Sequence, residues 1–292
     1  MADIWAIGFT ALHYEDMKKI AVCYHKGCLD GFAGAYAAWK ALGVKADYIG
    51  LEHQEPVPKS LKNRTLYFID FCYPKPVMKK VIAANDKVIV LDHHESQVEA
   101  IKLAWEYRYT TDHSGCVIAW KYFHPKKNPP ALLHIIEDND LFRFRKPETK
   151  RIIAALQYCK QHFAEYDRIA KSLEGTSGKK SMLRDGSLLL NAEQAMIDRL
   201  VERAEKVIFE GYAVYAVNTP LFYSQIANVI SIVKKVPFGI TWYYREGKLQ
   251  VSLRTSKSNV DVSELAKKYG GGGHRGAAGF SYEYKGMFPW KQ

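Results

Sequence analysis

The first half of the chain alternates short runs of apolar, often β-branched residues with segments of helical composition. Apolar runs of roughly four to eight residues predict buried strands, and the alanine-rich segment after the first run predicts a helix. Strands interleaved with helices imply a mostly parallel sheet with helices on its faces. The predicted strands are 20–24, 44–50, 65–69 and 86–91, and the predicted helices are 31–42, 77–84, 111–123 and 131–137.

The second half changes character near residue 211. Residues 151–209 are helical in composition except for an interruption at 174–180, and 188–209 is expected to be a connector helix. Beyond it, the chain shows strand patterns at 212–217, 237–244 and 248–254, a helical pattern at 261–268, and a glycine-rich segment at 270–280. The fold class is therefore α/β, with a first, parallel-sheet domain at 1–150, a helical connector at 151–208 and a smaller α/β domain at 209–292.

Three of the four predicted strands end in side chains that can hold a metal ion. They are His25, Cys28 and Asp30 after the first strand, Asp70 after the third, and Asp92, His93 and His94 after the fourth. A single aspartate after a strand is more often a helix cap or a turn residue. Capping does not account for three consecutive metal-capable residues. Since open α/β sheets place their chemistry at the carboxyl ends of the strands, one shared metal site is predicted.

Composition favours a negatively charged partner. The 292 residues are 48% hydrophobic and include 42 Lys plus Arg against 31 Asp plus Glu, a formal net charge of +11. Such an excess suits nucleic acid, nucleotide or polyphosphate, although a solvated basic surface is the simpler alternative. No run approaches the roughly 18 apolar residues of a membrane span, so no membrane partner is expected.

The cysteines and the first residues point to the cytoplasm. Five scattered cysteines, an odd number, are typical of reduced intracellular thiols rather than of a disulfide framework. The first eight residues lack the basic start and long apolar stretch of a secretory signal. A cytoplasmic location is expected, and a homodimer remains open.

Four consecutive glycines, 270–273, precede His274 and Arg275. Glycines maximise the entropy lost on ordering, so they are expected to bring backbone N–H groups close to an anion rather than to serve packing. Gly272 and Gly273 would offer those groups, and His274 and Arg275 would contact phosphate oxygens. A flexible hairpin is the alternative reading, and no Walker-type lysine follows.

Taken together, these motifs resemble those of the DHH phosphoesterase superfamily. Asp92-His93-His94 matches the motif that names the family. The signature of its DHH-associated C-terminal domain is similar to 271–274 together with 277–279. His25 with Asp30-Gly31, Asp70, and Asp138 within 137–144 resemble the first, second and fourth motifs. The five motifs occur in the family order and span nearly the whole chain.

The resemblance implies a two-metal site, usually manganese, between a parallel-sheet domain and a smaller lid domain. Its ligand set carries over as Asp70 bridging both ions, Asp30, His93 and Asp138 on one ion, and His25 on the other. Asp140 is the alternative to Asp138. Carboxylate and imidazole donors suit Mn²⁺, while Mg²⁺, another divalent metal or a single ion stays open.

The first motif departs from the family pattern. It has one extra residue and places Cys28 where a second carboxylate is expected. A thiolate is a soft ligand that would shift this position toward zinc or iron, or weaken it. Cys28 is therefore kept as a candidate ligand, and the second metal is the open part of the prediction.

Four further residues are candidates for contacts outside the metal shell. His94 is expected to face the substrate and to protonate the leaving group, with Asp92 beside it as the second catalytic residue. His113 and Arg254 are candidate substrate contacts, against an ordinary capped turn and a surface arginine. No base-stacking residue is assigned, because aromatic residues in helices usually belong to the core.

The predicted function is a metal-dependent phosphodiesterase, exonuclease-like, acting on short nucleic acids or small nucleotides. It would remove 5′-mononucleotides from short single strands or cleave a dinucleotide. A polyphosphatase or pyrophosphatase is a second hypothesis, since paired metals also support phosphoanhydride cleavage. A non-catalytic nucleotide sensor, with Cys28 marking a decayed site, is the third.

Overall fold

The computed structural model describes residues 18–52, 55–256 and 260–291. The chain divides into two compact units, Met1–Leu189 and Leu190–Gln292. Helix α8 (Thr176–Glu202) is continuous across this division, so the helical region predicted as a connector is shared between the units. Among the described residues, no helix has the length and apolar character that crossing a bilayer requires.

The first unit contains a five-stranded sheet in which every pair of neighbours is parallel. Its strands are β1 (Ile20–His25), β2 (Ala46–Leu51), β3 (Thr65–Ile69), β4 (Lys87–Asp92) and β5 (Glu106–Tyr109), in the order β2-β1-β3-β4-β5. The predicted α/β class with a mostly parallel sheet is confirmed.

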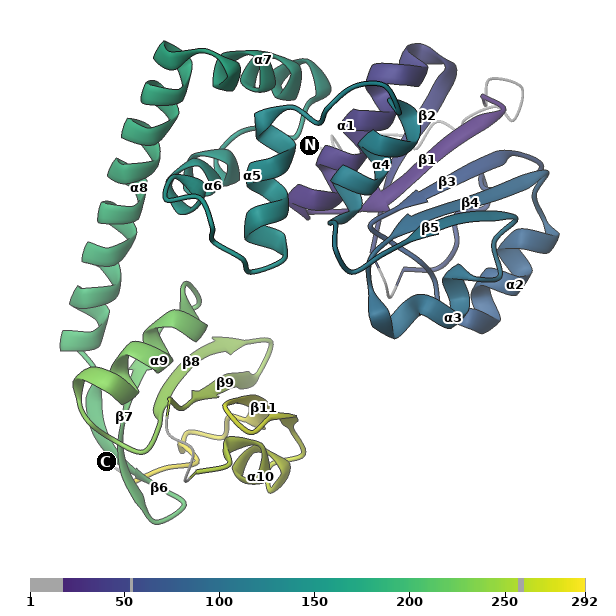
Figure 1. Cartoon of the computed structure of the whole chain (residues 1–292). Helices are drawn as coiled ribbons and strands as arrows, with labels where there is room; N and C mark the ends of the chain where they lie inside the picture. The colour runs from purple at the N-terminus through teal and green to yellow at the C-terminus, as the bar shows by residue number, and fades with distance from the viewer. Residues whose placement is uncertain (1–17, 53–54, 257–259, 292) are drawn as a thin grey trace, which may run out of the picture. The chain divides into compact units, whose positions relative to one another are not determined.

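Helices cover both faces of this sheet (Figure 1). Helices α1 (Leu29–Leu42) and α4 (Gly115–Phe123) lie on one face, and α2 (Lys75–Ala83) and α3 (Val98–Ile101) lie on the other. Helices α5 (Ala131–Asp140), α6 (Thr149–Gln157), α7 (Phe163–Glu174) and the first part of α8 add a helical layer that packs on α1 and α4. Two 3₁₀ turns, η2 (Gly43–Lys45) and η3 (Glu95–Gln97), complete the first unit. Successive strand residues enter opposite cores: Ile69 faces α1 and α4, while Phe68 faces α2 and α3. This two-residue period explains why the strands read as uninterrupted apolar runs.

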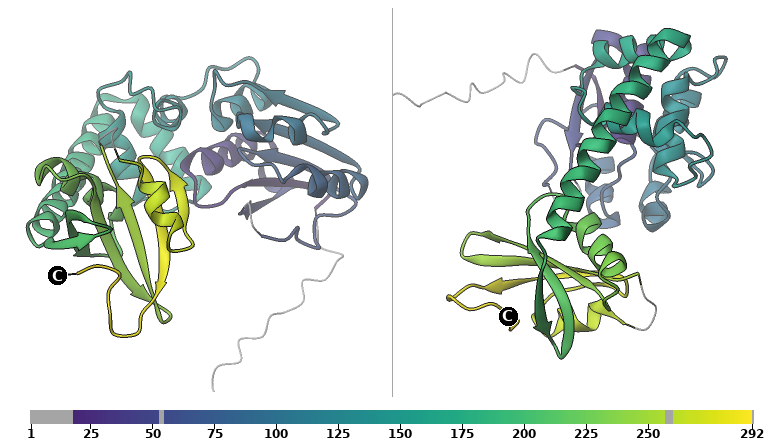
Figure 2. Two further views of the ribbon diagram at one scale, coloured as in Figure 1. Left: turned by 90° about the horizontal axis from the view of Figure 1, so that it is seen from below. Right: turned by 90° about the vertical axis from the view of Figure 1, so that its left-hand side faces the viewer.

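The second unit is built on a six-stranded sheet. Its strands are β6 (Glu205–Phe209), β7 (Tyr212–Asn218), β8 (Gly239–Arg245), β9 (Lys248–Arg254), β10 (Gly272–His274) and β11 (Ala277–Glu283), in the order β10-β11-β9-β8-β7-β6. The pairs are antiparallel except β7 with β8. Helices α9 (Tyr223–Val233) and α10 (Val262–Lys267) pack against opposite faces (Figure 2).

Two predicted boundaries in the helical region are wrong, and two elements were missed. Residues 205–209 form strand β6 rather than the end of a helix, because Glu210 and Gly211 both have positive φ, 50° and 82°, and close a tight hairpin onto β7. Helix α8 begins at Thr176, inside the segment predicted as an interruption. Strand β5 and helix α9 were not predicted.

Candidate metal centre at the carboxyl edge of the parallel sheet

The sheet order brings the carboxyl ends of β1, β3 and β4 together. Strand order reverses at β1, which has β2 on one side and β3 on the other, and ligands of open α/β sheets bind at such a switch point. His25 ends β1, Asp70 follows β3, and Asp92 ends β4. The structure therefore gathers at one edge the side chains that the strand-end pattern selects.

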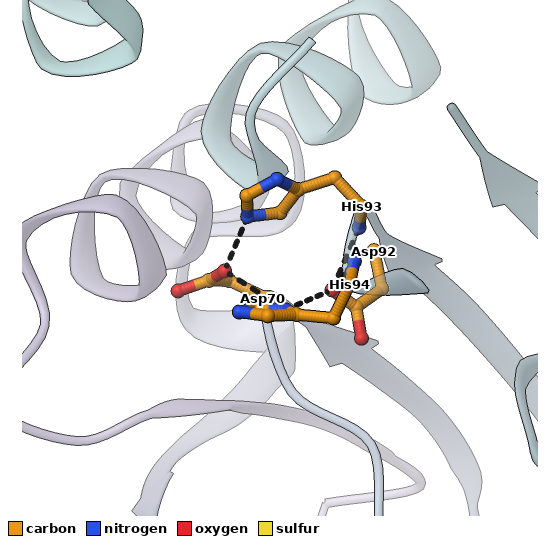
Figure 3. Close-up of side chains that lie close together, drawn as sticks. All are labelled: Asp70, Asp92, His93 and His94. Carbon is orange, nitrogen blue, oxygen red and sulfur yellow. Dashed lines mark hydrogen bonds and ion pairs between the residues drawn. The ribbon is translucent and has the colours of Figure 1, made fainter. Parts of the chain in front are cut away.

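Asp70 lies at the centre of the cluster, with a left-handed backbone (φ 53°) and an exposed fraction of 1%. Its Oδ1 is 3.3 Å from Nε2 of His93 and 3.8 Å from Nδ1 of His94, and its Oδ2 is 3.8 Å from Nδ1 of His25. Figure 3 shows the first two imidazoles turned toward this carboxylate. Burial opposes ionisation, but hydrogen bonding to His25 and His93 outweighs it and lowers the pKa of Asp70 to about 2.

Asp92 is fully buried beneath the two histidines and orients them. Its Oδ1 accepts hydrogen bonds from the backbone N–H of His93 and from Nδ1 of His94, both at 2.7 Å. The bond to Asp92, ahead of the opposing effect of burial, raises the pKa of His94. The His94 side chain is 38% exposed, so its ring stands at the surface of the cluster while Asp92 does not.

Asp30 enters from the first turn of α1 and is held by the start of α4. Ser114 Oγ donates to its Oδ1 at 2.6 Å, and the N–H of Cys116 donates at 3.2 Å. Burial, followed by the nearby carboxylates of Asp70 and Asp140, raises the pKa of Asp30 well above its ordinary value. Carboxylates this close require a positive counter-charge to be ionised together.

The fourth-motif prediction needs a correction, since Asp140 and not Asp138 joins the cluster. Asp140 Oδ2 lies 3.4 Å from Nε2 of His93, and ligand atoms of Asp30, His93 and Asp140 lie within 4.8 Å of one another. The carboxylate of Asp138 points instead to the following loop, where it accepts from the N–H groups of Arg145 and Lys146. Side chains two apart on a helix diverge by about 200°, so both cannot face the sheet edge.

A second group of donors contains the cysteine of the first motif. Ligand atoms of His25, Cys28 and Asp70 lie within 4.8 Å of one another. Burial and then the Asp70 carboxylate raise the pKa of the Cys28 thiol, which keeps it protonated in the absence of a cation. Asp70 is thus common to this group and to the group formed with Asp92, His93 and His94.

The cluster satisfies a simple test for divalent cations. Asp70 Oδ2, His93 Nε2 and Asp140 Oδ2 are buried, and among the described residues they meet only the other members of the cluster, in long contacts of 3.3–3.8 Å that leave their hydrogen-bonding capacity largely unused. Buried polar atoms that lack good hydrogen bonds are costly, so this arrangement needs an additional group that accepts their lone pairs. Carboxylate oxygens with imidazole nitrogens are the donor set of Mn²⁺ and related ions. The residues present fit the metal that the family resemblance implies.

Gly115 allows α4 to approach these carboxylates. A Cβ at this position would lie 2.7 Å from Cβ of Asp70 and 2.8 Å from Oδ2 of Asp30. Neither atom belongs to a flexible side-chain end that could move aside cheaply, because both residues are buried. Gly115 and Ser114 are not among the site residues predicted from the sequence. Both lie in the turn that starts the helix predicted at 111–123.

We expect Gly115→Ala to lower kcat/KM by about 100-fold, because ligand displacements near 1 Å cost that much. Overpacking should also lower the free energy of unfolding by about 1–3 kcal/mol. Steady-state kinetics with thermal unfolding checks both effects. Gly175→Ala is the matched control, since its Cβ would meet only Ser172 O at 3.7 Å. Equal effects of the two substitutions would contradict the close approach at Gly115.

A pocket of about 390 Å³ adjoins the cluster within the first unit. Its wall includes Asp30 and Asp140, so it opens directly onto the candidate metal donors. The remaining lining residues are Gly27, Cys28, Leu29, Ile136, Asn139, Leu156, Gln157, Cys159 and Gln161. Carboxylates, amides and thiols alternate with a few apolar side chains along this wall, so the pocket suits a small polar ligand.

His113 lies beside the site but is engaged on both ring nitrogens. Lys121 Nζ, which can only donate, lies 2.6 Å from Nε2, so Nδ1 carries the proton that is shared with Glu137 at 2.7 Å. Glu137 also accepts from the N–H of Ser114, the residue that holds Asp30. The structure thus links His113 to the metal cluster through Glu137. Glu137 is not among the site residues predicted from the sequence.

The predicted substrate residues of the second unit lie on β9, β10 and the turn to β11. Gly272, Gly273 and His274 form β10, and Arg275 follows. Arg254 ends β9 and donates to Ser224 Oγ and to the carbonyls of Leu253 and Ala278.

The expectation that these glycines serve no packing role is wrong at two positions. A Cβ on Gly271 would lie 2.2 Å from Gly279 O, and one on Gly273 would lie 2.5 Å from Ala277 O. Both glycines are needed so that this segment can pack against β11. A Cβ on Gly272 would meet nothing within 4 Å, so this position stays open for a ligand.

Comparisons with known proteins agree with this architecture. Residues 212–289 match the DHHA1 domain. The chain is 28% identical over 299 residues to protein R106 of Acanthamoeba polyphaga mimivirus, covering 93% of this chain and 69% of that one. It is 25% identical over 225 residues to oligoribonuclease NrnB of Bacillus subtilis, covering 70% of this chain and 55% of NrnB. The fold is similar to that of the pGpG-specific phosphodiesterase PggH from Vibrio cholerae, with a TM-score of 0.53 and 12% identity over 92% of this chain and 94% of that one.

Carboxylates and imidazoles gathered at the carboxyl edge of a parallel sheet, in a chain that also carries a DHHA1 domain, define a phosphoesterase, a hydrolytic enzyme. The sequence match and the similarity of the fold both point to this class of enzyme. The DHHA1 match over residues 212–289 and the similarity to NrnB support the resemblance to the DHH phosphoesterase superfamily.

Proposed function

We propose that this enzyme is a metal-dependent phosphodiesterase that hydrolyses short oligonucleotides or dinucleotides from a chain end and releases mononucleotides. The observation that carries the proposal is the group of buried ligand atoms on Asp70, His93 and Asp140, which make only long contacts with one another and with His25, next to a pocket of about 390 Å³. A pocket of that size suits one nucleotide rather than a long duplex. The named activities of NrnB and PggH support the same substrate class.

Two groups of residues would hold the cations. Asp30, His93 and Asp140 form one group, and His25, Cys28 and Asp70 form the other. Divalent ions bound there would supply Lewis-acid stabilisation of the phosphoryl oxygens and a water of lowered pKa. Manganese is the metal we propose, since hard oxygen donors dominate the first group.

His94 is the residue that we propose moves a proton. Its Nδ1 is bonded to Asp92, which leaves Nε2 to carry the proton toward the leaving oxygen. The hydrogen bond to Asp92 raises the pKa of His94 and so favours the protonated ring that a general acid requires. Asp92 then acts as a positioning residue, because its buried carboxylate holds the ring and cannot itself reach substrate.

The second unit would contribute phosphate contacts. Adjacent N–H groups of a strand point to opposite sides, so one of Gly272 and Gly273 directs its N–H away from the pairing with β11. The exposed side chains of His274 and Arg275 carry donors suited to phosphate oxygens. Arg254, bonded to Ser224 and two carbonyls, would hold the start of α9 beside them. The net charge of +11 favours such a polyanionic substrate.

A substrate panel tests the proposal. Metal-depleted protein, with and without added Mn²⁺, is incubated with an RNA dinucleotide, an RNA of about 20 nucleotides, a cyclic dinucleotide, a 3′,5′-bisphosphonucleoside and polyphosphate. We expect Mn²⁺-dependent release of 5′-mononucleotide, fastest from the dinucleotide. Phosphate release from polyphosphate alone would overturn the phosphodiesterase proposal. Nucleotide binding without turnover of any substrate would support a sensor instead.

A further inference from the structure

The loop between α5 and α6 presents two phenylalanines to solvent immediately after Asp140. The side chain of Phe142 is 82% exposed and that of Phe144 is 37% exposed. Large aromatic side chains are normally buried, and an exposed one next to a polar site is more informative than a scattered surface residue. They follow the candidate metal ligand Asp140 by two and four residues along the chain.

Both phenylalanines hold backbone conformations that bulky residues avoid. Phe142 has φ 52° and Phe144 has φ 46°, in the left-handed region where glycine is the favoured residue. Glycine would adopt this turn at a lower conformational free energy than phenylalanine does. The two aromatic residues are therefore present despite a conformational cost. Strain of this kind persists mostly at functional sites.

The residue once predicted as a metal ligand holds this loop in shape. The Asp138 carboxylate accepts from the N–H groups of Arg145 and Lys146 at 2.9 and 3.2 Å and from the hydroxyl of Thr149. Its backbone carbonyl accepts from the N–H groups of Arg143 and Phe144. The loop is therefore a rigid platform rather than a loose connection.

Aromatic and basic residues alternate along the platform, in the order Phe142, Arg143, Phe144, Arg145, Lys146. The two rings meet edge to face with centroids 5.6 Å apart, and Lys150 Nζ lies 5.1 Å from the Phe144 centroid. Phe144 is thereby engaged from two sides, while Phe142 keeps most of its surface in solvent. Sites for single-stranded nucleic acid combine such rings, on which bases stack, with cations along the backbone.

We propose that Phe142 is a stacking surface for an unpaired nucleobase of the substrate, with Phe144 supporting its ring and Arg145 and Lys146 facing the adjacent phosphate. This inference rests on the proposed phosphodiesterase function and adds to it the element that recognises a base. It also gives Asp138 a role as a positioning residue for the platform. Stacking accepts every base, so the site selects nucleotides without selecting sequence.

The test compares a dinucleotide with the same molecule lacking one base, each base being removed in turn. In the wild-type enzyme, kcat/KM for the intact dinucleotide should exceed that for one of the two abasic forms. Phe142→Ala should lower this ratio by about 5- to 100-fold, mainly through KM, because that is the range of a stacking contact. Phe142→Tyr should restore the ratio, and Phe142→Leu, which keeps apolar area without a ring, should not.

Trp105→Ala is the matched control, because Trp105 is 75% exposed and lies at the amino end of β5, opposite the candidate metal edge. It should leave the ratio unchanged. An equal loss for intact and abasic substrates in Phe142→Ala, or no change in either, would overturn the stacking proposal while leaving the phosphodiesterase intact. Failure of the wild-type enzyme to cleave either molecule would instead overturn the proposed function.

A stability measurement separates recognition from folding. Phe142→Gly relieves the left-handed strain, so the variant should unfold at a higher temperature than wild type while its intact-to-abasic ratio falls as in Phe142→Ala. A lower unfolding temperature would show that the Phe142 ring contributes to the fold. It would contradict the proposal that this ring is kept at a conformational cost in order to stack on a base.

Discussion

Asp70→Asn is expected to lower kcat by at least about 1000-fold, the consequence of losing several kcal/mol of metal-derived transition-state stabilisation. Asp70 belongs to the group with His25 and Cys28, and its Oδ1 lies 3.3 Å from His93 of the other group, so removing its charge should weaken both cation sites. Asparagine has the same shape and tolerates the left-handed backbone at this position, where φ is 53°. The measurements are kcat and bound metal determined by elemental analysis.

The same variant should retain its fold. In the metal-free protein, Asp70 adds a carboxylate close to Asp30 and Asp140, and this charge raises the pKa of both neighbours. Relief of this repulsion offsets only part of the loss of the hydrogen bonds to His25 and His93 that lower the pKa of Asp70, so the metal-free variant should unfold at a somewhat lower temperature near neutral pH. The stabilisation that Mn²⁺ gives to the wild-type protein should disappear. Asp185→Asn, an exposed carboxylate on α8, is the control. Activity within tenfold of wild type in Asp70→Asn would exclude a central role for this carboxylate.

The architecture of the first unit could be predicted because its strands are buried on both faces. A strand such as β4 sends Val88 and Val90 into one core and Ile89 and Leu91 into the other, so it leaves an uninterrupted apolar run in the sequence. Strand β5 has no such run, since its Glu106 to Tyr109 segment lies at the edge of the sheet and is largely polar. Edge strands carry less hydrophobic signal and escape pattern analysis.

The strand ends of the site were predictable for the same reason, whereas its helical contributions were not. A residue directly after a parallel strand must lie at the carboxyl edge, so Asp70 and His93 follow from the order of the chain. A helical residue faces the site only if the helix has the right rotation, which depends on packing. Burial alone does not distinguish a site residue from a structural one. Asp138 is only 5% exposed, yet its carboxylate hydrogen-bonds to the following loop and not to the site.

Substitutions of Asp140 and Asp138 are therefore expected to differ strongly in their effects on kcat and on stability. Asp140→Asn should lower kcat by about 100- to 1000-fold, the range for loss of one charged group acting on the transition state, with little loss of stability. In the fold, Asp140 lies in the last turn of α5, where the helix dipole disfavours a carboxylate, so neutralising it should not weaken the metal-free protein.

Asp138→Asn should show the opposite balance. Its carboxylate accepts three hydrogen bonds from Arg145, Lys146 and Thr149, and an amide can accept through only one of its two atoms. We expect the free energy of unfolding to fall by about 1–3 kcal/mol, the cost of leaving a buried donor unsatisfied. Metal content should stay at the wild-type level, and kcat should fall less than in Asp140→Asn. Loss of metal from Asp138→Asn, with normal metal content in Asp140→Asn, would reverse the assignment and restore the ligand that the family motif suggests.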